Sequence, residues 1–304
     1  MGSLNRFNRK STADQVLGGL DLGNHTFLVT GCASGIGFET LRALAARGAH
    51  VVGTARTLDR ARQACERVAG STAAVACDQD DFESVATAAQ DIRALGLCFD
   101  AIIANAGIMV PPEPDLRYGV ESQFRVNHLS HMLLVSRIAD LLREGTGRLV
   151  MVSSSAAQDF APKQGIVFDN LDAHAGYKPF AFYGQSKLAN LCFAKSMAGR
   201  LSARGVASNA LHPGMIASTD LARTLPLWGR LALPLASLFS KSIAQGAATQ
   251  CYLAAHSDLN GVTGTFFADC RVSKPNPHAD DPAFREKLWR VSETILRSHA
   301  PAAA

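Results

Sequence analysis

The run "LVTGCASGIGFET", residues 28–40, decides the fold, because it joins an apolar strand to a helix through a glycine-rich turn. We predict that the strand ends at Thr30 and that the helix opens near Gly35. Glycines at positions 31, 35 and 37 allow a tight turn, close approach of the backbone to a pyrophosphate, and close packing of helix on strand. The helix N-terminus adds N–H donors and a partial positive charge for phosphate groups. The run therefore predicts the dinucleotide-binding turn of an α/β fold; the alternative is a glycine-rich turn that binds no ligand.

The same alternation of strand and helix continues through most of the chain. Seven short apolar runs are predicted as strands: 26–30, 50–55, 73–77, 99–105, 147–153, 206–212 and 264–268. Helix-length segments lie between or after them: 38–47, 84–95, 123–142, 187–201 and 244–255. This order predicts a single Rossmann-like, doubly wound, seven-stranded parallel sheet flanked by helices. We place this NADP-binding domain at residues 25–275, between an N-terminal extension (1–24) and a C-terminal helical tail (276–304).

Composition and charge exclude several classes of protein. The chain has 304 residues, of which 47% are hydrophobic, enough for a large core. Its net charge of +4 comes without basic runs, so we expect no nucleic-acid partner. The seven cysteines are odd in number and show no C-x-x-C spacing, which favours reduced thiols in the cytoplasm. No apolar signal region opens the sequence, and Arg6 stands where a myristoylation signal needs Ser or Thr.

One apolar segment, residues 225–239, is the nearest approach to a membrane sequence. It is shorter than a span and is interrupted by Pro226, Arg230 and Pro234. We therefore expect no membrane span, and we leave open whether this segment is a substrate lid, a peripheral membrane contact or packing. Assembly into a homo-oligomer is also left open.

The end of the second predicted strand indicates which dinucleotide the fold binds. An NAD-binding fold normally has Asp or Glu there to hold the ribose 2′-hydroxyl. This strand instead continues into Arg56, with no acid before Asp59. A guanidinium suits a 2′-phosphate, so Arg56 favours NADP(H) over NAD(H); the alternative is an exposed arginine at the start of the next helix. After the third strand, Asp78 either bonds the adenine amino group or caps a turn or helix.

Six motifs follow one another in a recognisable order: "TGCASGIG", "ANAG", "VNHLSHMLL", "GRLVMVSSS", "YGQSK" and "LHPG". Together they resemble the short-chain dehydrogenase/reductase family in its non-extended form, over nearly the whole chain. Longer strings such as "YGQSKLANLCFAKSMAGRLSARGV" and "QGAATQCYLAA" are similar to the branch of retinol dehydrogenases and the WW-domain-containing oxidoreductase. The N-terminal extension lacks the paired tryptophans of a WW module.

The resemblance implies roles for four catalytic residues. Tyr183 would be the general acid/base, and Lys187 would lower the pKa of Tyr183 and bind the ribose. Ser154 would orient the substrate oxygen, and Asn127 would hold the water that links Lys187 to a proton relay. With Arg56 and Asp78 included, the residues expected to bind the cofactor are Gly31, Ser34, Gly35, Ile36, Gly37, Arg56, Asp78, Asn105, Ala106, Gly107, Tyr183, Lys187, Pro213, Gly214 and Ile216.

Two positions depart from the family pattern or leave it open. The usual doubled asparagine before Ala-Gly is Ala104-Asn105 here, which removes one polar side chain. The choice of Ser154 within the serines at 153–155 rests on alignment. Alternate side chains of a strand face opposite ways, so the two neighbouring serines cannot share the direction of Ser154 while the strand continues.

The Tyr183–Lys187 pair works as an acid/base only in a dry pocket. A tyrosine with its ordinary pKa of about 10 is a poor base at pH 7, and lowering that pKa by about three units needs about 4 kcal/mol. An ammonium about 4 Å away supplies only about 1 kcal/mol in water but about 4 kcal/mol in a partly enclosed site. Helical spacing of four places both side chains on one face. The alternative is a half-buried tyrosine beside a snorkelling lysine.

Aromatic residues between Ser154 and Tyr183 indicate a lipophilic or aromatic alcohol or carbonyl substrate, although such an insert is as often simple packing. We therefore predict an NADP(H)-dependent oxidoreductase. The alternatives are a non-catalytic NADP(H)-binding regulatory or scaffold protein and an enzyme resembling protochlorophyllide reductase. We expect no metal: the histidines form no H-E-x-x-H pair, so His128 and His131 are interpreted as helix-packing residues. The absence of a G-x-S-x-G elbow excludes a serine hydrolase.

Overall fold

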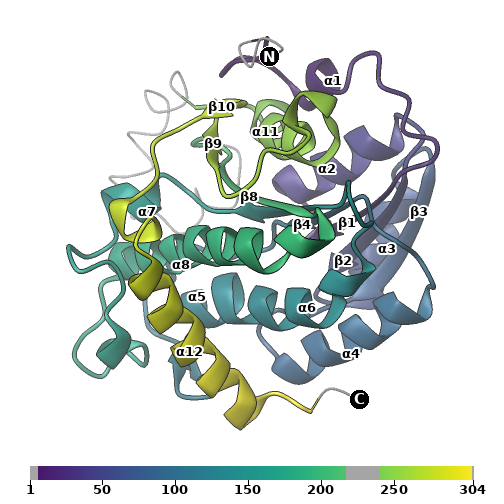
Figure 1. The fold of residues 1–304 in the computed structure, drawn as a ribbon. Coiled ribbons are helices and arrows are strands. Elements are labelled where there is room, and N and C mark those ends of the chain that lie inside the picture. The colour runs from purple at the N-terminus through teal and green to yellow at the C-terminus, as the bar shows by residue number, and fades with distance from the viewer. Residues whose placement is uncertain (1–5, 217–239, 303–304) are drawn as a thin grey trace.

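The computed structural model describes residues 6–216 and 240–302 of the chain (Figure 1). The apolar segment 225–239, whose role the sequence leaves open, lies outside the described residues.

A mostly parallel sheet forms the centre of the molecule, with strand order β10-β9-β8-β7-β4-β1-β2-β3. The seven parallel strands are β1 (Thr26–Thr30), β2 (His50–Ala55), β3 (Ser71–Ala76), β4 (Ala101–Ala104), β7 (Arg148–Val152), β8 (Ala207–His212) and β9 (Phe266–Ala268). Consecutive strands run outward from β1 toward β3 on one side and from β4 toward β9 on the other. The order reverses between β1 and β4, the place where open α/β sheets bind ligands. The predicted fold class and its seven strands are confirmed.

An eighth strand, β10 (Arg271–Val272), was not predicted. It pairs antiparallel with β9 through a hairpin whose central residues, Asp269 and Cys270, have φ of 55° and 59°. Two consecutive residues at positive φ are typical of a type I′ turn, which normally contains Asn and Gly. The dipeptide Asp-Cys carries a weak turn signal, and two residues are too short to show a strand pattern. A second small hairpin, β5 (Leu116–Arg117) and β6 (Val120–Glu121), lies apart from the main sheet.

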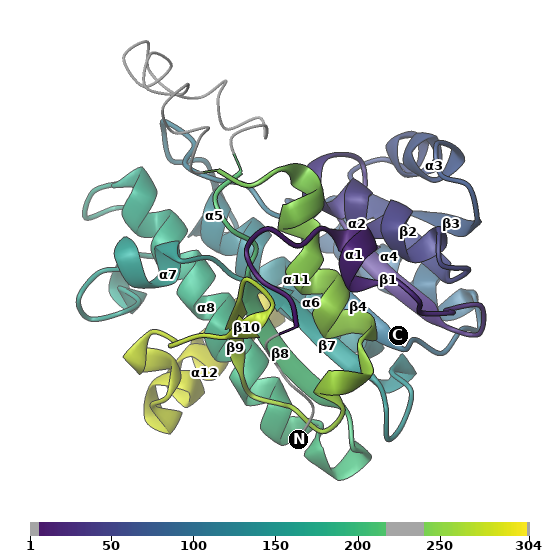
Figure 2. The same cartoon turned by 90° about the horizontal axis from the view of Figure 1, so that it is seen from above.

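Helices cover both faces of the sheet (Figure 2). One face carries α1 (Ala13–Val16), α2 (Gly35–Ala45), α3 (Leu58–Glu66) and α11 (Ile243–Ala255). The other carries α4 (Phe82–Ala94), α5 (Ser122–Phe124), α6 (Ser130–Ile138), α8 (Pro179–Arg200) and α12 (Pro282–His299), with α7 (Ala156–Asp159) packed against α8. Short 3-10 turns lie at Ala139–Leu141, Phe168–Asn170, Ser202–Arg204, Ser257–Leu259 and Pro277–Ala279.

The observed helices differ from the predicted ones at three places. Helix α3 was not predicted, because its sequence is mostly polar with few apolar positions. Helix α8 begins at Pro179, eight residues before the predicted start, so that Tyr183 lies well inside it. The predicted helix 123–142 is divided, and its residues Arg125–Leu129 form a π-helical turn.

Alternate residues of the central strands contribute to two separate hydrophobic cores, one on each face of the sheet. Leu28 and Ile102 belong to the core beneath α4, α6 and α8, whereas Val29 and Ile103 belong to the core beneath α2 and α11. This is the two-residue period of a strand buried on both faces.

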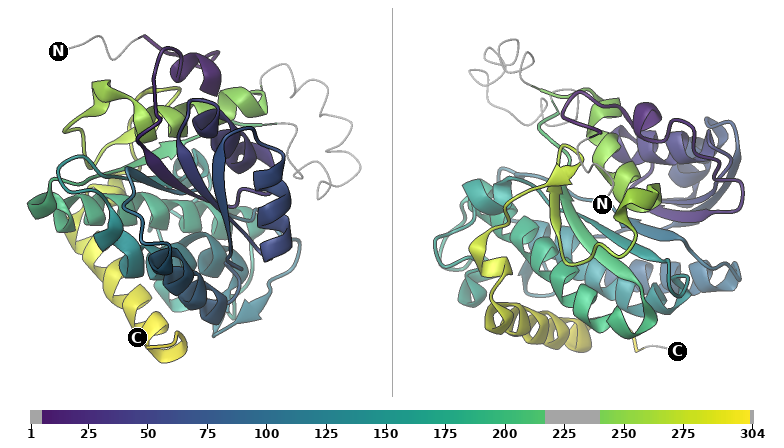
Figure 3. Two further views of the ribbon diagram at one scale, coloured as in Figure 1. Left: turned by 90° about the vertical axis from the view of Figure 1, so that its right-hand side faces the viewer. Right: turned by 45° about the horizontal axis from the view of Figure 1, so that its top comes forward.

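Both ends of the chain pack on these helices (Figure 3). Helix α1 lies against α11 and α2, and Phe7 meets the ring of Tyr252 edge-on at 5.5 Å. At the other end, α12 lies along α8, where Trp289 stacks on Phe193 at 5.7 Å between ring centroids.

Candidate active site

The three glycines of the turn after β1 differ in what surrounds them. A Cβ on Gly31 would lie 2.9 Å from Ala106 Cα, and one on Gly37 would lie 2.2 Å from the carbonyl oxygen of Gly31. These two positions are therefore fixed by the packing of α2 and β4 on the turn. Gly35 has a φ of 57°, and nothing lies within 4 Å of where its Cβ would be. The backbone of Gly35 faces open space.

A cleft of about 810 Å³ lies over this turn, at the carboxyl ends of the strands. It brings together ten of the residues predicted to bind the cofactor: Gly31, Ser34, Gly35, Ile36, Gly37, Arg56, Asp78, Asn105, Ala106 and Gly107. It also contains residues for which the sequence gave no signal, including Arg60, Gln79, Asp80, Asp115 and Val126. A second cleft of about 850 Å³ adjoins the first and shares Ala33, Ser34 and Gly35 with it.

The residues of the cleft fit a nicotinamide dinucleotide. Ser34 is the N-cap of the 11-residue helix α2, but its side chain makes no capping bond, so it leaves the first-turn N–H groups to another acceptor. Together with the open space over Gly35, this gives room and donors for a pyrophosphate. Arg56 and Arg60 lie at the β2 end of the cleft, and Arg56 Nε lies 3.7 Å from the carboxylate of Asp78.

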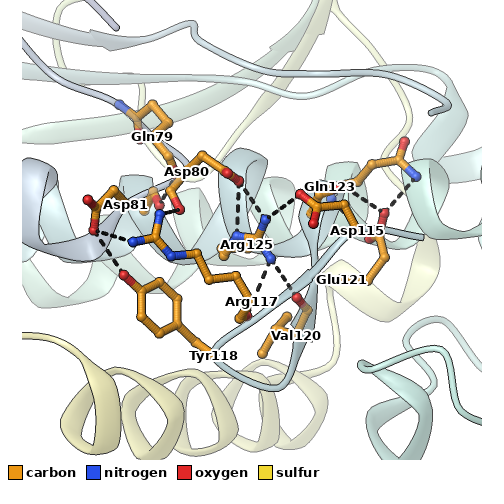
Figure 4. Close-up of polar contacts among 12 residues, drawn as sticks. Gln79, Asp80, Asp81, Asp115, Arg117, Tyr118, Val120, Glu121, Gln123 and Arg125 are labelled. Carbon is orange, nitrogen blue, oxygen red and sulfur yellow. Dashed lines mark hydrogen bonds and ion pairs between the residues drawn. The ribbon is translucent and has the colours of Figure 1, made fainter. Parts of the chain in front are cut away.

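The buried guanidinium of Arg125, a residue that the sequence did not single out, holds one wall of the cleft. Figure 4 shows Arg125, from the π-helical turn, between two carboxylates. Its Nη2 lies 2.6 Å from Asp80 and 3.1 Å from Asp115, and its Nη1 donates to the carbonyl of Val120 at 2.7 Å. Arg117 and Tyr118 tie Asp81 to the same region. Arg125 is fully buried, so its ion pairs fix the segments around Asp80 and Asp115 relative to one another.

Asn127, two residues further along the π-helical turn, holds the inner part of the same wall. Its Oδ1 accepts the N–H of Ile108 at 2.8 Å, and its Nδ2 donates to the carbonyl of Ile108 at 3.0 Å and to Ser186 Oγ at 2.9 Å. Gln123 accepts the N–H of Val110 at 2.7 Å. The side-chain amide of Asn127 is therefore bonded within the protein, and its expected part in a proton relay stays a prediction.

The predicted catalytic side chains meet where α8 passes the end of β7. Ser154 hydrogen-bonds Tyr183, and Lys187 Nζ lies 5.7 Å from the centroid of the Tyr183 ring. Lys187 also donates to the carbonyl of Val152 at 3.3 Å. A Cβ on Gly107 would lie 3.3 Å from Lys187 Nζ, so this group directly adjoins the cleft.

The three consecutive serines point to different partners. Ser153 Oγ donates to the carbonyl of Lys187 at 2.6 Å, and the N–H of Ser155 donates to His212 Nδ1 at 3.1 Å at the start of α7. Ser154 has its hydroxyl beside Tyr183. The choice of Ser154 among the three serines stays a prediction.

Burial controls the titration of the Tyr183–Lys187 pair. It lowers the pKa of Lys187 to about 8 and raises the pKa of Tyr183 to about 12. Only the hydrogen bond from Ser154 acts in the opposite direction on Tyr183. The expected lowering of the tyrosine pKa by Lys187 is thus not found here: the ammonium bonds the Val152 carbonyl, and desolvation outweighs its field.

The residues expected at the nicotinamide side follow β8. Gly214 has a φ of 101°, and a Cβ there would lie 2.5 Å from the side chain of Lys241. Lys241 in turn forms an ion pair of 2.6 Å with Asp269. Ile216 forms a β-bridge with Lys241, and its side chain packs over Gly246 beside Ile36. Ile216 is thereby brought near the start of α2, but it lies outside the lining of the main cleft, as do Pro213, Gly214, Tyr183 and Lys187.

Comparison with known proteins agrees with this geometry. The model of the family described as short chain dehydrogenase matches residues 25–167. The short-chain dehydrogenase TIC 32 B, chloroplastic, of Brassica napus is 38% identical over 302 residues, which cover 95% of this chain and 93% of the relative. The chain belongs to the short-chain dehydrogenase family.

Other members of this short-chain dehydrogenase family are similarly close. The human WW domain-containing oxidoreductase is 34% identical, with 96% of this chain and 73% of the relative covered. Retinol dehydrogenase 14 of Mus musculus is 33% identical, with 89% of this chain and 85% of the relative covered. The predicted branch is therefore confirmed. Among solved structures, an uncharacterized protein from Mycobacterium paratuberculosis superposes with a TM-score of 0.73 at 28% identity, and covers 96% of this chain and 100% of the other.

Within residues 6–216 and 240–302, no three or more His, Cys, Asp or Glu side chains are grouped so as to hold a metal ion. None of the helices in these ranges has both the length and the apolar character that a bilayer crossing needs.

Proposed function

We propose that the protein is an NADP(H)-dependent oxidoreductase that interconverts a lipophilic or aromatic alcohol and its ketone or aldehyde by hydride transfer. The observation that carries the proposal is that Ser154, Tyr183 and Lys187 lie together, and that Lys187 Nζ adjoins Gly107, which lines the dinucleotide cleft. An acid, an orienting hydroxyl and a cation at the edge of such a cleft are what carbonyl reduction requires of a protein.

Each side chain then has one task. Tyr183 donates its hydroxyl proton to the carbonyl oxygen in reduction and accepts the alcohol proton in oxidation. Ser154, already bonded to Tyr183, orients the substrate oxygen. Lys187, whose Nζ adjoins Gly107 in the wall of the cleft, binds the ribose. A bound nicotinamide supplies or accepts the hydride. Asn127 fixes Ile108 and supports the proton relay.

The preference for NADP(H) is supported by two arginines at the β2 end of the cleft. Arg56 is well exposed and Arg60 lies near it on the cleft lining, so both guanidinium groups can turn toward a 2′-phosphate. No carboxylate stands at the end of β2, where one would hold a free 2′-hydroxyl. Asp78, which pairs with Arg56, orients that guanidinium and is available to the adenine amino group.

The lipophilic character of the substrate is supported by apolar side chains near Tyr183. Phe180 lies one helical turn before Tyr183 on α8, and its ring packs 5.1 Å from that of Phe160. Both rings are almost half exposed, and Met215, beyond Gly214, is more than half exposed. Exposed aromatic groups around a polar reactive centre are typical of a site for an apolar ligand.

A screen for NADPH consumption over lipophilic aldehydes and ketones tests the proposal. We expect turnover by the wild type, and we expect Tyr183→Phe to bind NADPH without turnover. If the wild type binds NADPH but reduces no carbonyl compound, a non-catalytic binding role replaces the proposal. A light-dependent reaction with protochlorophyllide would instead assign the protein to that reductase class.

The free cysteines, six of them buried, support a reducing compartment such as the cytoplasm.

A further inference from the structure

A buried histidine connects the dinucleotide-binding turn to the π-helical turn. His131 lies in α6 and is fully buried. Its Nε2 is 2.9 Å from Thr30 Oγ1, at the end of β1, and its Nδ1 is 2.9 Å from the carbonyl oxygen of Asn127. The two ring nitrogens thus contact two segments that are 97 residues apart in the chain.

The hydrogen bonds around Thr30 decide the tautomer of this histidine. Thr30 Oγ1 accepts the N–H of Asn105 at 2.9 Å and the N–H of Ala106 at 3.0 Å. A hydroxyl has two acceptor lone pairs and one proton, so the proton of Thr30 must be donated to His131 Nε2. The proton of the neutral imidazole is then on Nδ1, which donates to the Asn127 carbonyl. Burial lowers the pKa of His131 to about 4, in agreement with a neutral ring.

The two segments joined by His131 hold adjacent parts of one wall. Thr30 holds the backbone of Asn105 and Ala106, and Asn127 holds the backbone of Ile108. Residues 105–108 all line the dinucleotide cleft. Between these two attachments lies Gly107, which adjoins Lys187 Nζ. The position of this wall relative to Lys187 therefore depends on the distance that His131 maintains between Thr30 and Asn127.

We propose that His131 is a positioning residue that sets the cofactor wall 105–108 against Lys187 and thereby controls affinity for the dinucleotide. The inference rests on the proposed function and concerns a residue that its sequence context suggested was mere helix packing. His131 does not line the dinucleotide cleft; it acts through Thr30 and Asn127.

A second buried histidine provides a matched control. His128 lies three residues before His131 and is also buried. Its Nε2, however, bonds Ser292 Oγ of α12, away from the cleft. Its Nδ1 has no partner among the described residues. A purely structural role would make His128 and His131 equivalent, whereas positioning of the wall would make only His131 matter for the dinucleotide.

Substitutions at His131 can separate its hydrogen bond to Asn127 from its hydrogen bond to Thr30. His131→Asn places an amide near the Nδ1 position and can keep the bond to Asn127, and His131→Gln places one near Nε2 and can keep the bond to Thr30. His131→Phe loses both. By titration of intrinsic fluorescence with NADPH, we expect Kd to rise about tenfold in His131→Phe and less in each amide variant. The KM for NADPH should rise with Kd, while kcat changes less.

Controls make the outcome decisive. We expect His128→Phe to lower the unfolding midpoint without changing the Kd for NADPH by more than about twofold. Thr30→Ser should bind like the wild type and Thr30→Val should not, because serine keeps the hydroxyl. An unchanged Kd in folded His131→Phe and Thr30→Val overturns the inference, as does equal weakening by the His128 and His131 variants. A wild type that binds NADPH without turnover contradicts only the proposed function, and one that binds no dinucleotide contradicts both.

Discussion

Arg125 and Asn127 lie two residues apart in one π-helical turn and hold the same cleft wall by different means. Arg125 uses charge: its buried guanidinium pairs with Asp80 and Asp115, whose side chains are 37% and 67% exposed. Asn127 uses neutral hydrogen bonds to Ile108 and Ser186, entirely within the protein.

The difference follows from what each end of the cleft must do. The end near Arg125 can admit water, because its carboxylates remain solvated. The end near Asn127 must exclude water, because the field of Lys187 is strong only at low dielectric. A charged clamp at that end would also compete with Lys187 for the phenolate. The comparison therefore separates a solvated end, where we propose that the dinucleotide binds, from a dry end, where we propose that the reaction occurs.

The largest expected effect is at the dry end. Tyr183→Phe removes the proton donor but keeps the ring, so kcat should fall by about 10²–10⁴. The Kd for NADPH should stay near that of the wild type, measured on the same preparation. Residual turnover above about a tenth of wild type would show that the reactive proton comes from elsewhere.

At the solvated end the larger effect is on stability. Asp80→Ala leaves the buried guanidinium of Arg125 with only the exposed Asp115, and we expect the free energy of unfolding to fall by about 3 kcal/mol. Urea denaturation measures this loss. Asp140→Ala breaks a surface pair with Arg93 of similar length, 2.7 Å, and should cost less than about 1 kcal/mol. Equal losses in the two variants would mean that the Arg125 pair is no more than a surface contact.

The dry end should also make stability depend on pH through Lys187. Its pKa of about 8 lies below the ordinary 10.5, so the burial cost of the ammonium is fully present below pH 8 and disappears as the pH rises to 10.5. Relative to Lys187→Met, the wild type should gain about 2 kcal/mol between pH 8 and pH 10. Tyr183, with its pKa raised to about 12, opposes this gain only above pH 10. Urea denaturation of both proteins at the two pH values tests the prediction, and a constant difference contradicts it.

The smallest expected effect is at the arginines of the solvated end. Arg56→Ala should raise the Kd for NADPH about tenfold and leave that for NADH nearly unchanged, because only NADPH carries the 2′-phosphate. The effect should weaken at high salt, since Arg56 is exposed. Arg62→Ala, on the same helix as Arg60 but outside the cleft lining, is the matched control. Equal preference of the wild type for both dinucleotides would remove the assigned role of Arg56.

The parts that sequence could predict are those with local causes. The strands follow from their apolar runs, and the turn at 31–37 follows from its glycines, because backbone conformation and burial act over a few residues. Tyr183 and Lys187 share one face because they share one helix.

The parts that sequence missed depend on contacts between distant segments. Arg125 meets Asp80 across 45 residues, and His131 meets Thr30 across 101. The π-helical turn is a local distortion within a regular apolar pattern, and nothing in that pattern marks it. The titration of Tyr183 also depends on burial by the whole fold, so the field of Lys187 alone did not predict its direction.

The packing of α11 on α1 and α2 affects how the chain must be made. Helix α11 packs on α1 and α2, yet it is synthesised on the order of 200 residues after α2. At cellular rates of translation this interval is about 10–40 s. Throughout it, the apolar residues of α1 and α2 that pack on α11 lack their final cover on the ribosome, so this fold completes its first half only when its last quarter has emerged.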